Sequence, residues 1–323
     1  MTPLRIIFMG TAELSCASLG KLAADVNFQI LAVVTQPDKP TGRVSQKQPF
    51  SPVKMLAQSL NLPLLQPVKA RDEGFIAELA GLRPDLMVVV AYGQILPQRL
   101  LEVPKHGCLN VHTSLLPKYR GAAPIQWAIA DGEEFTGVTI MRMDAGLDTG
   151  PILSTRRTAI LPADDSQTLH DRLAELGAEL LVETIPGYVG GTIVPQSQPT
   201  EGSSYAAKIT REDGRIDWSL PAQKIWNRLR AFTPWPGGFT FLPGQGKSQL
   251  LKIWRAEVVE GAGAAGQVLA ADKNGIVVAC GQGALRILEL QREGGKRLTA
   301  EQFLAGQHGV ANVTLDPIIQ KPV

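Results

Sequence analysis

An asparagine and a histidine stand two residues apart at the end of a predicted strand, within 109–117 (LNVHTSLLP). Side chains alternate faces along a strand, so Asn110 and His112 project to the same side. This pair suits acyl chemistry, because an amide can stabilise an oxyanion and an imidazole can polarise a group or move a proton. A second polar cluster, 144–150 (DAGLDTG), follows another apolar stretch and offers Asp148 in a turn flanked by glycines.

Each of these residues also has a structural interpretation. A lone histidine near a strand end is more often a hydrogen-bonded structural residue than a catalyst, and Asp before Thr-Gly is a common turn composition. The catalytic interpretation requires Asp148 to lie within reach of His112, which neighbouring strand ends of a parallel sheet allow. Asp144 is the weaker candidate and is expected to complete the turn. Ser114 lacks a Gly-x-Ser-x-Gly context, which argues against a serine nucleophile.

The first half of the chain alternates apolar strands with helical patterns. This alternation predicts an α/β fold with a doubly wound, mostly parallel Rossmann-like sheet, in which ligands bind beyond the carboxyl ends of the strands. The predicted strands are 6–9, 30–35, 86–91, 109–112 and 138–143. The predicted helices are 52–60, 72–81, one that begins near 124, and 166–185.

Composition changes after residue 189. Residues 190–206 are rich in Gly, Pro, Ser and Thr, which predicts a linker between a catalytic domain at 1–189 and a second domain at 207–323. Short strands separated by Gly-containing turns predict a small OB-like β-barrel in the second domain. The predicted elements there are a helix at 221–230, strands at 239–242, 250–259, 266–270, 275–280 and 284–290, and a last helix opened by a capping box at 299–302.

The composition excludes several classes of protein. Of 323 residues, 44% are hydrophobic and 19% charged, without an apolar run long enough to span a membrane and without a secretory signal pattern. Three widely spaced cysteines indicate a reducing cytoplasm, and the scattered His and Cys residues show no metal-ligand spacing. A single glycine at the first strand end, Gly10, is a weak sign of nucleotide binding. Residues 1–204 carry 17 Lys or Arg against 20 Asp or Glu (net −3), and 205–323 carry 15 against 10 (net +5).

Three segments in this order resemble the folate-dependent formyltransferase family: Asn110-x-His112, 114–124 (SLLPKYRGAAP) and 146–151 (GLDTGP). The resemblance implies direct transfer of a formyl group from 10-formyltetrahydrofolate to an amine, with no metal and no nucleotide. It implies that Asn110 and His112 stabilise the oxyanion, and that Asp148 orients the imidazole and assists proton transfer. In such enzymes the segment of Ser114, Leu115, Leu116 and Pro117 lines the folate site.

The positions of the basic residues bear on which molecule accepts the formyl group. The loop 36–49 is long and polar for a strand–helix connection and carries Lys39, Arg43 and Lys47. It is either a surface loop or an arm that contacts nucleic acid, and family members that act on transfer RNA have a basic insertion here. Lys224 and Arg228 lie in a helix that mixes cations and aromatics, which is either ordinary packing or part of a surface that holds transfer RNA.

The resemblance therefore implies initiator methionyl-tRNA as the acceptor, formylmethionyl-tRNA as the product, and a role in translation initiation. We expect a cytoplasmic monomer. Three alternatives differ in the acceptor or in the class of protein. Glycinamide ribonucleotide formyltransferases normally stop after one domain, amino sugar nucleotide formyltransferases share even the C-terminal fold, and a silent RNA-binding protein would bind RNA without formyl transfer. Lys118 and Arg120 either hold the glutamate tail of folate or form a solvated basic turn.

Overall fold

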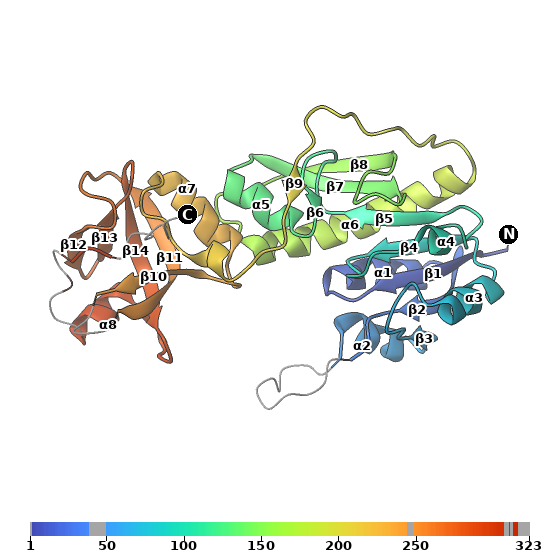
Figure 1. The fold of residues 1–323 in the computed structure, drawn as a ribbon, viewed down its shortest axis with the longest axis horizontal. Helices are drawn as coiled ribbons and strands as arrows, with labels where there is room; N and C mark the ends of the chain where they lie inside the picture. Colours follow the sequence, from blue (N-terminus) through green and yellow to red (C-terminus); the bar gives the residue numbers. More distant parts are fainter. Residues whose placement is uncertain (1, 39–49, 244–247, 307–309, 311–312, 316–323) are drawn as a thin grey trace. The chain divides into compact units, whose positions relative to one another are not determined.

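The computed structural model describes residues 2–38, 50–243, 248–306, 310 and 313–315 (Figure 1). The chain forms two compact units. The first consists of Met1–Pro124, Phe135–Ala159 and Leu169–Ala206, and the second of Ile125–Glu134, Ile160–Thr168 and Ala207–Val323. Within the described residues, no helix combines the length and the apolar content that crossing a membrane requires.

The described part of the first unit is built around a sheet of seven strands with helices on both faces (Figure 1). In spatial order the strands are β3 (Leu64–Leu65), β2 (Phe28–Val34), β1 (Leu4–Gly10), β4 (Leu86–Val90), β5 (Cys108–His112), β7 (Phe135–Arg142) and β8 (Ile152–Ala159). The first five of these are parallel, which confirms the predicted α/β class. The strand order reverses between β1 and β4, the switch point where doubly wound sheets bind ligands.

The helices that cover the described part of this sheet are α1 (Leu14–Ala24), α2 (Pro52–Ser59), α3 (Glu73–Gly81), α4 (Gln98–Leu101) and α6 (Ser166–Val189). Side chains cap the N-termini of some of them. The side chain of Ser51 accepts a hydrogen bond from the Lys54 amide, and Pro52 occupies the first helical position of α2. Asp72 caps α3 in the same way. The predicted helices are present, and α6 extends beyond its predicted end at 185.

Burial accounts for the parallel core. Strand β4 (LMVVV) is buried at every residue, as a strand covered on both faces must be. On one face, Met9 of β1 belongs to a core cluster with Phe75 of α3 and Leu100 of α4. On the other face α6 approaches β5 closely, because a Cβ at Gly177 would lie 2.7 Å from Val111 Cγ1. The strand that carries Asn110 and His112 is therefore fixed from several sides.

Strand β7 corrects one expectation. It runs antiparallel to β5, with Leu109 opposite Arg142 and His112 opposite Thr139, so β7 ends beside the start of β5. The prediction that the polar segment after β7 leaves the sheet at the same edge as His112 is therefore wrong. Strands β7 and β8 form a hairpin, and hairpin partners are antiparallel. The connection 143–151 turns back along β5, and Asp148 reaches His112 by this route.

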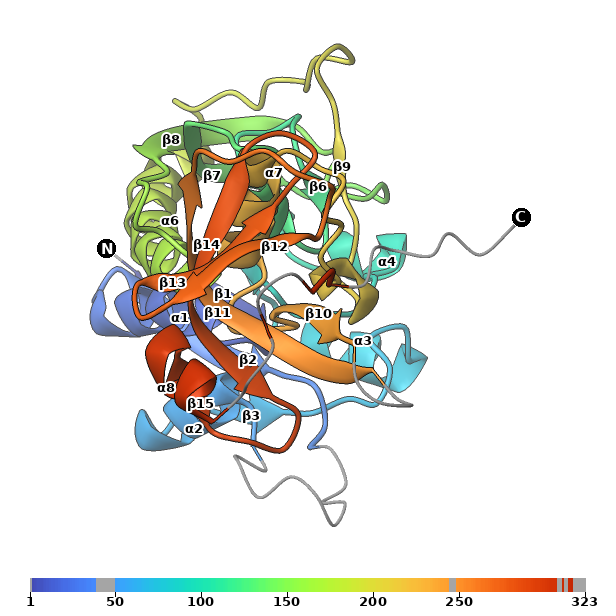
Figure 2. The ribbon, with the colours of Figure 1, turned by 90° about the vertical axis from the view of Figure 1, so that its left-hand side faces the viewer.

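The second unit contains an antiparallel sheet. Its strands are β10 (Gly238–Leu242), β11 (Gln249–Val259), β14 (Ala284–Arg292), β13 (Gly275–Ala279) and β12 (Val268–Asp272) in spatial order, with β15 (Arg297–Thr299) paired to β14. Its helical elements are α5 (Pro124–Asp131), the 3-10 turn η1 (Glu212–Gly214), α7 (Ala222–Ala231) and α8 (Ala300–Ala305). Figure 2 shows α8 beside β15, where the predicted capping box of Thr299 and Gln302 is present.

Closure of this sheet into a barrel stays a prediction. Among the described residues, β12 and β10 stand at opposite ends of the hydrogen-bonded order and do not pair with each other. The strands expected from the sequence are nevertheless present, with boundaries shifted by a few residues. Their inner face forms an apolar core around Trp218, Leu285 and Phe303. The observed architecture is an antiparallel β domain.

Candidate active site

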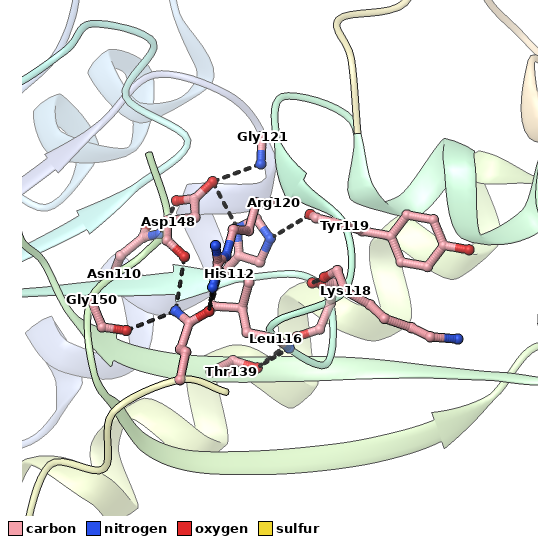
Figure 3. A network of polar contacts seen from close by, with 12 residues as sticks. Asn110, His112, Leu116, Lys118, Tyr119, Arg120, Gly121, Thr139, Asp148 and Gly150 are labelled. Atoms are coloured by element: carbon pink, nitrogen blue, oxygen red, sulfur yellow. Dashed lines mark hydrogen bonds and ion pairs between the residues drawn. The ribbon is translucent and has the colours of Figure 1, made fainter. Parts of the chain in front are cut away.

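Strand β5 presents two of the predicted site residues on one side. Asn110 and His112 are two positions apart, and Figure 3 shows both beside Asp148. The strand pairs with β4 on one edge and with β7 on the other, which fixes its backbone. The side chain of His112 is 6% exposed, whereas Asn110 is partly buried. Both side chains thus start from a rigid element.

Contacts at both ring nitrogens determine the tautomer of His112. Its Nε2 lies 2.9 Å from the carbonyl oxygen of Tyr119. A carbonyl oxygen can only accept, so Nε2 carries the hydrogen. Nδ1 therefore faces Asp148, whose Oδ2 is 3.7 Å away. When the ring gains a second proton, that proton is on Nδ1, directly opposite the carboxylate.

Asp148 is held by its side chain and by its surroundings. Its Oδ2 accepts a hydrogen bond of 2.8 Å from the Gly121 amide, and its Oδ1 accepts one of 3.4 Å from Asn110 Nδ2. Its backbone has φ +53°, the left-handed region that L-residues adopt at a cost of about 1–2 kcal/mol. Two residues later only glycine fits, since a Cβ at Gly150 would lie 1.9 Å from the Arg142 carbonyl oxygen. The structure brings the three predicted catalytic residues together.

Asp144 forms the turn, as expected for the weaker candidate. It is exposed, and its Oδ1 accepts hydrogen bonds from the Gly146 amide at 3.0 Å and from Thr149 Oγ1 at 2.8 Å. These contacts shape the connection that carries Asp148.

The segment predicted to line the folate site is largely buried. Ser114 Oγ donates to the Lys118 carbonyl oxygen at 2.6 Å, and Leu116 N donates to Thr139 Oγ1 at 3.1 Å. Thr139 Oγ1 in turn donates to the Ser114 carbonyl oxygen at 2.7 Å. These bonds shape the turn that brings the Tyr119 carbonyl to His112. Leu115 and Pro117 are partly buried.

Sequence analysis missed Gln198 and Ser204. The side-chain amide of Gln198 contacts the carbonyl oxygens of Asp148 and Gly150 and the guanidinium of Arg120. Ser204 Oγ accepts from the Tyr119 amide at 2.9 Å. Both lie in the segment that its composition predicts as a linker. Nothing in a Gly-, Pro- and Ser-rich stretch signals such contacts.

Strand β6 (Arg120–Gly121) also forms backbone hydrogen bonds with the stretch 190–206. It pairs with β9 (Tyr205–Ala206) as a two-stranded parallel sheet. Because Gly121 N is the donor to Asp148, β9 supports the strand from which that hydrogen bond comes. Arg120 is engaged by Gln198.

The loop after β4 is a second feature that sequence analysis missed. Val89 pairs with Asn110 in parallel register, so Ala91 follows at the level of His112. Thr11 Oγ1 donates to the carbonyl oxygen of Tyr92 at 2.9 Å, which ties this loop to the end of β1. Ile95 in the same loop is 88% exposed. Burial raises the pKa of Tyr92 to about 12, and its hydroxyl has no hydrogen-bond partner among the described residues.

The residues predicted to contact transfer RNA divide into two groups. Lys39, Arg43 and Lys47 lie outside the described residues. Lys224 Nζ forms an ion pair with Asp131 at 3.1 Å. Arg228 Nη2 donates to the carbonyl oxygen of Asp213 at 2.9 Å, and its guanidinium lies over the ring of Phe232.

An ion pair joins a residue before the basic residues of the loop 36–49 to a residue of the helix that follows the loop. Lys54 of α2 pairs with Asp38, and this hydrogen bond lowers the pKa of Asp38. Thr35 and Ser51 also share a hydrogen bond of 2.9 Å. The described residues on the two sides of the loop are therefore joined.

No group of three or more His, Cys, Asp or Glu side chains in the described part of the chain is placed to hold a metal ion. The chemistry available at the site is that of an amide, an imidazole and a carboxylate. These groups can stabilise negative charge on an oxygen and transfer a proton.

Comparison with known families matches both units. A family model described as "Formyl transferase" matches residues 4–185, and one described as "Formyl transferase, C-terminal domain" matches residues 208–308. Among curated proteins, the methionyl-tRNA formyltransferase of Citrifermentans bemidjiense is 52% identical over 306 residues, which cover 95% of this chain and 94% of that protein. The methionyl-tRNA formyltransferase of Myxococcus xanthus is 52% identical over 302 residues, 94% of this chain and 95% of that protein.

Solved structures share the fold. HypX from Aquifex aeolicus in complex with tetrahydrofolic acid has a TM-score of 0.61 at 18% identity; the match covers 99% of this chain and 50% of HypX. The chain thus spans about half the length of HypX. The N-formyltransferase from Helicobacter canadensis, in complex with folinic acid and dTDP-3-aminofucose, has a TM-score of 0.66 at 20% identity, covering 91% of this chain and 100% of that one.

Proposed function

The chain belongs to the methionyl-tRNA formyltransferase family, and we propose that Asn110, His112 and Asp148 carry out the reaction of that family in this protein. The protein transfers the formyl group of 10-formyltetrahydrofolate to the free amino group of methionyl-tRNA, which yields formylmethionyl-tRNA for translation initiation. The observation that carries the residue assignment is the joint contact of the Asp148 carboxylate with Asn110, His112 and the Gly121 amide.

The reaction makes two demands on the site. The methionine amine forms a bond to the formyl carbon, the bond from that carbon to N10 breaks, and the proton lost by the amine ends on N10. Negative charge on the formyl oxygen must be stabilised meanwhile, and the proton must be moved. An amide donor and an imidazole–carboxylate pair supply these two functions.

Asn110 and His112 stabilise the formyl oxygen. Asn110 Nδ2 has a 3.4 Å hydrogen bond to Asp148, a long contact that a substrate oxygen can replace. His112 Nε2 is occupied by the Tyr119 carbonyl and Nδ1 faces Asp148, so His112 acts on the formyl oxygen through the charge of its imidazolium and not through a free N–H. The imidazolium adds a full positive charge next to the oxygen that becomes negative.

Asp148 accepts the proton of the attacking amine and stabilises the imidazolium. Its carboxylate is 13% exposed, so the carboxylate and the ring interact in a medium of lower dielectric than water. The Gly121 amide fixes the oxygen that faces Nδ1. The roles assigned here agree with those that the resemblance implies.

The folate site is proposed at the edge of the sheet where β4 and β5 end. The connection of β4 to α4 offers exposed Ile95, and the β7–β8 connection offers Leu147, which is 53% exposed. Exposed apolar side chains at this edge fit the flat ring of a pterin. The segment 114–117 supports this site, because its hydrogen bonds shape the turn after β5. It consists of Ser114, Leu115, Leu116 and Pro117.

Transfer RNA contacts are proposed at Lys39, Arg43 and Lys47 and at Lys224 and Arg228. The net charge of +5 over 205–323 supports the contacts proposed in the C-terminal domain. Trp254 of that domain adds to them, since Lys252 and Arg297 lie 5.4 Å and 5.0 Å from its ring. An aromatic ring flanked by cations is suited to nucleic acid. We propose that this domain is an OB-like barrel at 207–323, and that the protein is a cytoplasmic monomer.

Parallel acceptor assays test the proposal. Formyl transfer from 10-formyltetrahydrofolate is measured with charged initiator methionyl-tRNA, with glycinamide ribonucleotide and with an amino sugar nucleotide. Formylation of the charged transfer RNA alone is expected. Turnover of either small acceptor at a comparable kcat/KM would contradict the proposed use of the basic surfaces.

A further inference from the structure

We propose that Gln198 is a positioning residue for formyl transfer, which locks the loop carrying Asp148 to the loop carrying Gly121. The inference rests on the proposed role of Asp148 and adds a residue outside the three predicted segments. Gln198 does not touch the reacting atoms. It acts through the backbone of Asp148 and the side chain of Arg120.

All four hydrogen-bonding positions of the Gln198 amide are used. Nε2 donates to the carbonyl oxygens of Asp148 at 2.8 Å and of Gly150 at 2.7 Å. Oε1 accepts from Arg120 Nε at 3.1 Å and from Arg120 Nη2 at 2.7 Å. A carbonyl cannot donate and a guanidinium cannot accept, so the amide has a single possible orientation. Glutamine is the residue type that satisfies both partners at this length.

These contacts close a ring around Asp148, and Figure 3 labels its members Arg120, Gly121 and Asp148. Its carboxylate accepts from Gly121 N, Gly121 follows Arg120, Arg120 is bound by Gln198, and Gln198 returns to the Asp148 carbonyl. The ring matters because Asp148 has φ +53°, a conformation that persists only when its surroundings hold it. Gln198 fixes the Asp148 backbone from one side, and Gly121 fixes its carboxylate from the other.

The same segment supports His112. Ser204 Oγ accepts from the amide of Tyr119, which itself has φ +60°. The Tyr119 carbonyl is the partner of His112 Nε2. Both members of the imidazole–carboxylate pair are therefore positioned by 198–204, a stretch whose composition gives no sign of such a role. Gln198 is the member of this stretch that reaches the Asp148 side.

Loss of Gln198 is expected to slow the reaction without loss of binding. A displacement of a reacting group by about 1 Å can cost about 100-fold in rate. Gln198→Ala is therefore expected to lower kcat about 10- to 100-fold, while KM for 10-formyltetrahydrofolate and for methionyl-tRNA changes less than about twofold. Gln196→Ala is the matched control, because Gln196 lies in the same stretch and its side chain is exposed.

Gln198→Glu separates the contact with Arg120 from the contacts with the carbonyl oxygens of Asp148 and Gly150. It keeps an acceptor for Arg120 but places carboxylate oxygen against the carbonyls of Asp148 and Gly150. A kcat at least as low as that of Gln198→Ala is expected. A wild-type kcat would show that only attachment to Arg120 matters and would overturn the proposal. Gln198→Met, which keeps the side-chain length, repeats the test if the alanine variant fails to fold.

A double variant distinguishes this inference from the role of Asp148. In an Asp148→Asn background, Gln198→Ala is expected to add less than about twofold to the loss, because it acts through the missing carboxylate. An equal cost in both backgrounds would overturn the inference. An inactive Asp148→Asn with a wild-type-like Gln198→Ala overturns the inference alone. An active Asp148→Asn overturns the role of Asp148 and the inference with it.

Discussion

Replacing Asp148 by asparagine removes the charge at the centre of the site and preserves its shape. The asparagine oxygen can take the place of Oδ2 and accept the hydrogen bond from Gly121 N, which is 2.8 Å long in the structure. The side chain keeps its length and number of heavy atoms, so the loop retains its anchor. The variant therefore isolates the contribution of the negative charge next to His112.

The distance between the two groups gives the magnitude. Opposite unit charges 3.7 Å apart interact by about 4.5 kcal/mol at an effective dielectric of about 20. At 1.36 kcal/mol per factor of ten, this corresponds to a loss of about 2,000-fold in kcat. Proton acceptance by the carboxylate is lost as well, so about 1,000- to 10,000-fold is the expected range. Folate binding is expected to stay largely intact.

The assay is single-turnover formylation of methionyl-tRNA with saturating 10-formyltetrahydrofolate, together with equilibrium binding of tetrahydrofolate. Asp144→Asn is the control, because it removes an equal charge from an exposed residue of the same connection. The control is expected to keep its rate, since asparagine can accept the same turn hydrogen bonds. A loss of less than tenfold for Asp148→Asn, with binding intact, would refute the argument.

Three further predictions concern other parts of the chain. Asn110→Ala is expected to lower kcat about 100- to 1,000-fold by removing an oxyanion donor; an effect confined to KM in steady-state kinetics would contradict this. Arg43→Ala is expected to lower kcat/KM for methionyl-tRNA about tenfold and to spare folate binding; an unchanged kcat/KM would reduce the basic loop to a surface feature. Burial raises the pKa of the thiols of Cys108 to about 12 and of Cys280 to about 11. The reactive thiolate is thus scarce at pH 8, so iodoacetamide is expected to leave both thiols unmodified in the native protein, and rapid alkylation measured by mass spectrometry would argue against their burial.

Strand β5 shows what the sequence allows one to predict. A two-residue spacing in an apolar run is enough to place Asn110 and His112 on one side, because the period of a strand is fixed by its backbone. The alternation of strands and helices is likewise enough for the parallel core. Several of its strands are continuous apolar runs, and such runs are typical of a parallel sheet that helices cover on both faces.

Strand direction is harder to predict. The apolar run of β7 has the appearance of a buried parallel strand, and nothing in its residues signals its antiparallel pairing with β5 and β8. Asp148 is nevertheless identified from the sequence, because the resemblance to a family carries it. The residues alone would leave it as a turn former.

The hydrogen bonds of Gln198 and Ser204 show that composition alone does not predict whether a segment is ordered. Glycine, proline and serine lower the expected order of a segment, yet hydrogen bonds to a neighbouring loop can hold such a chain in one conformation. These are contacts between residues far apart in sequence, such as Tyr119 and Ser204. A single sequence carries no local signal for them.

The pairing of β6 with β9 determines where this protein can be divided. A cut at 189, where composition changes, would remove Gln198, Ser204 and β9 from the unit that holds Asn110 and His112. The first unit extends to Ala206, so a catalytic fragment that keeps Gln198, Ser204 and β9 ends at or after that residue. Domain exchange with relatives that accept other amines should therefore carry the entire stretch 190–206 with the catalytic half.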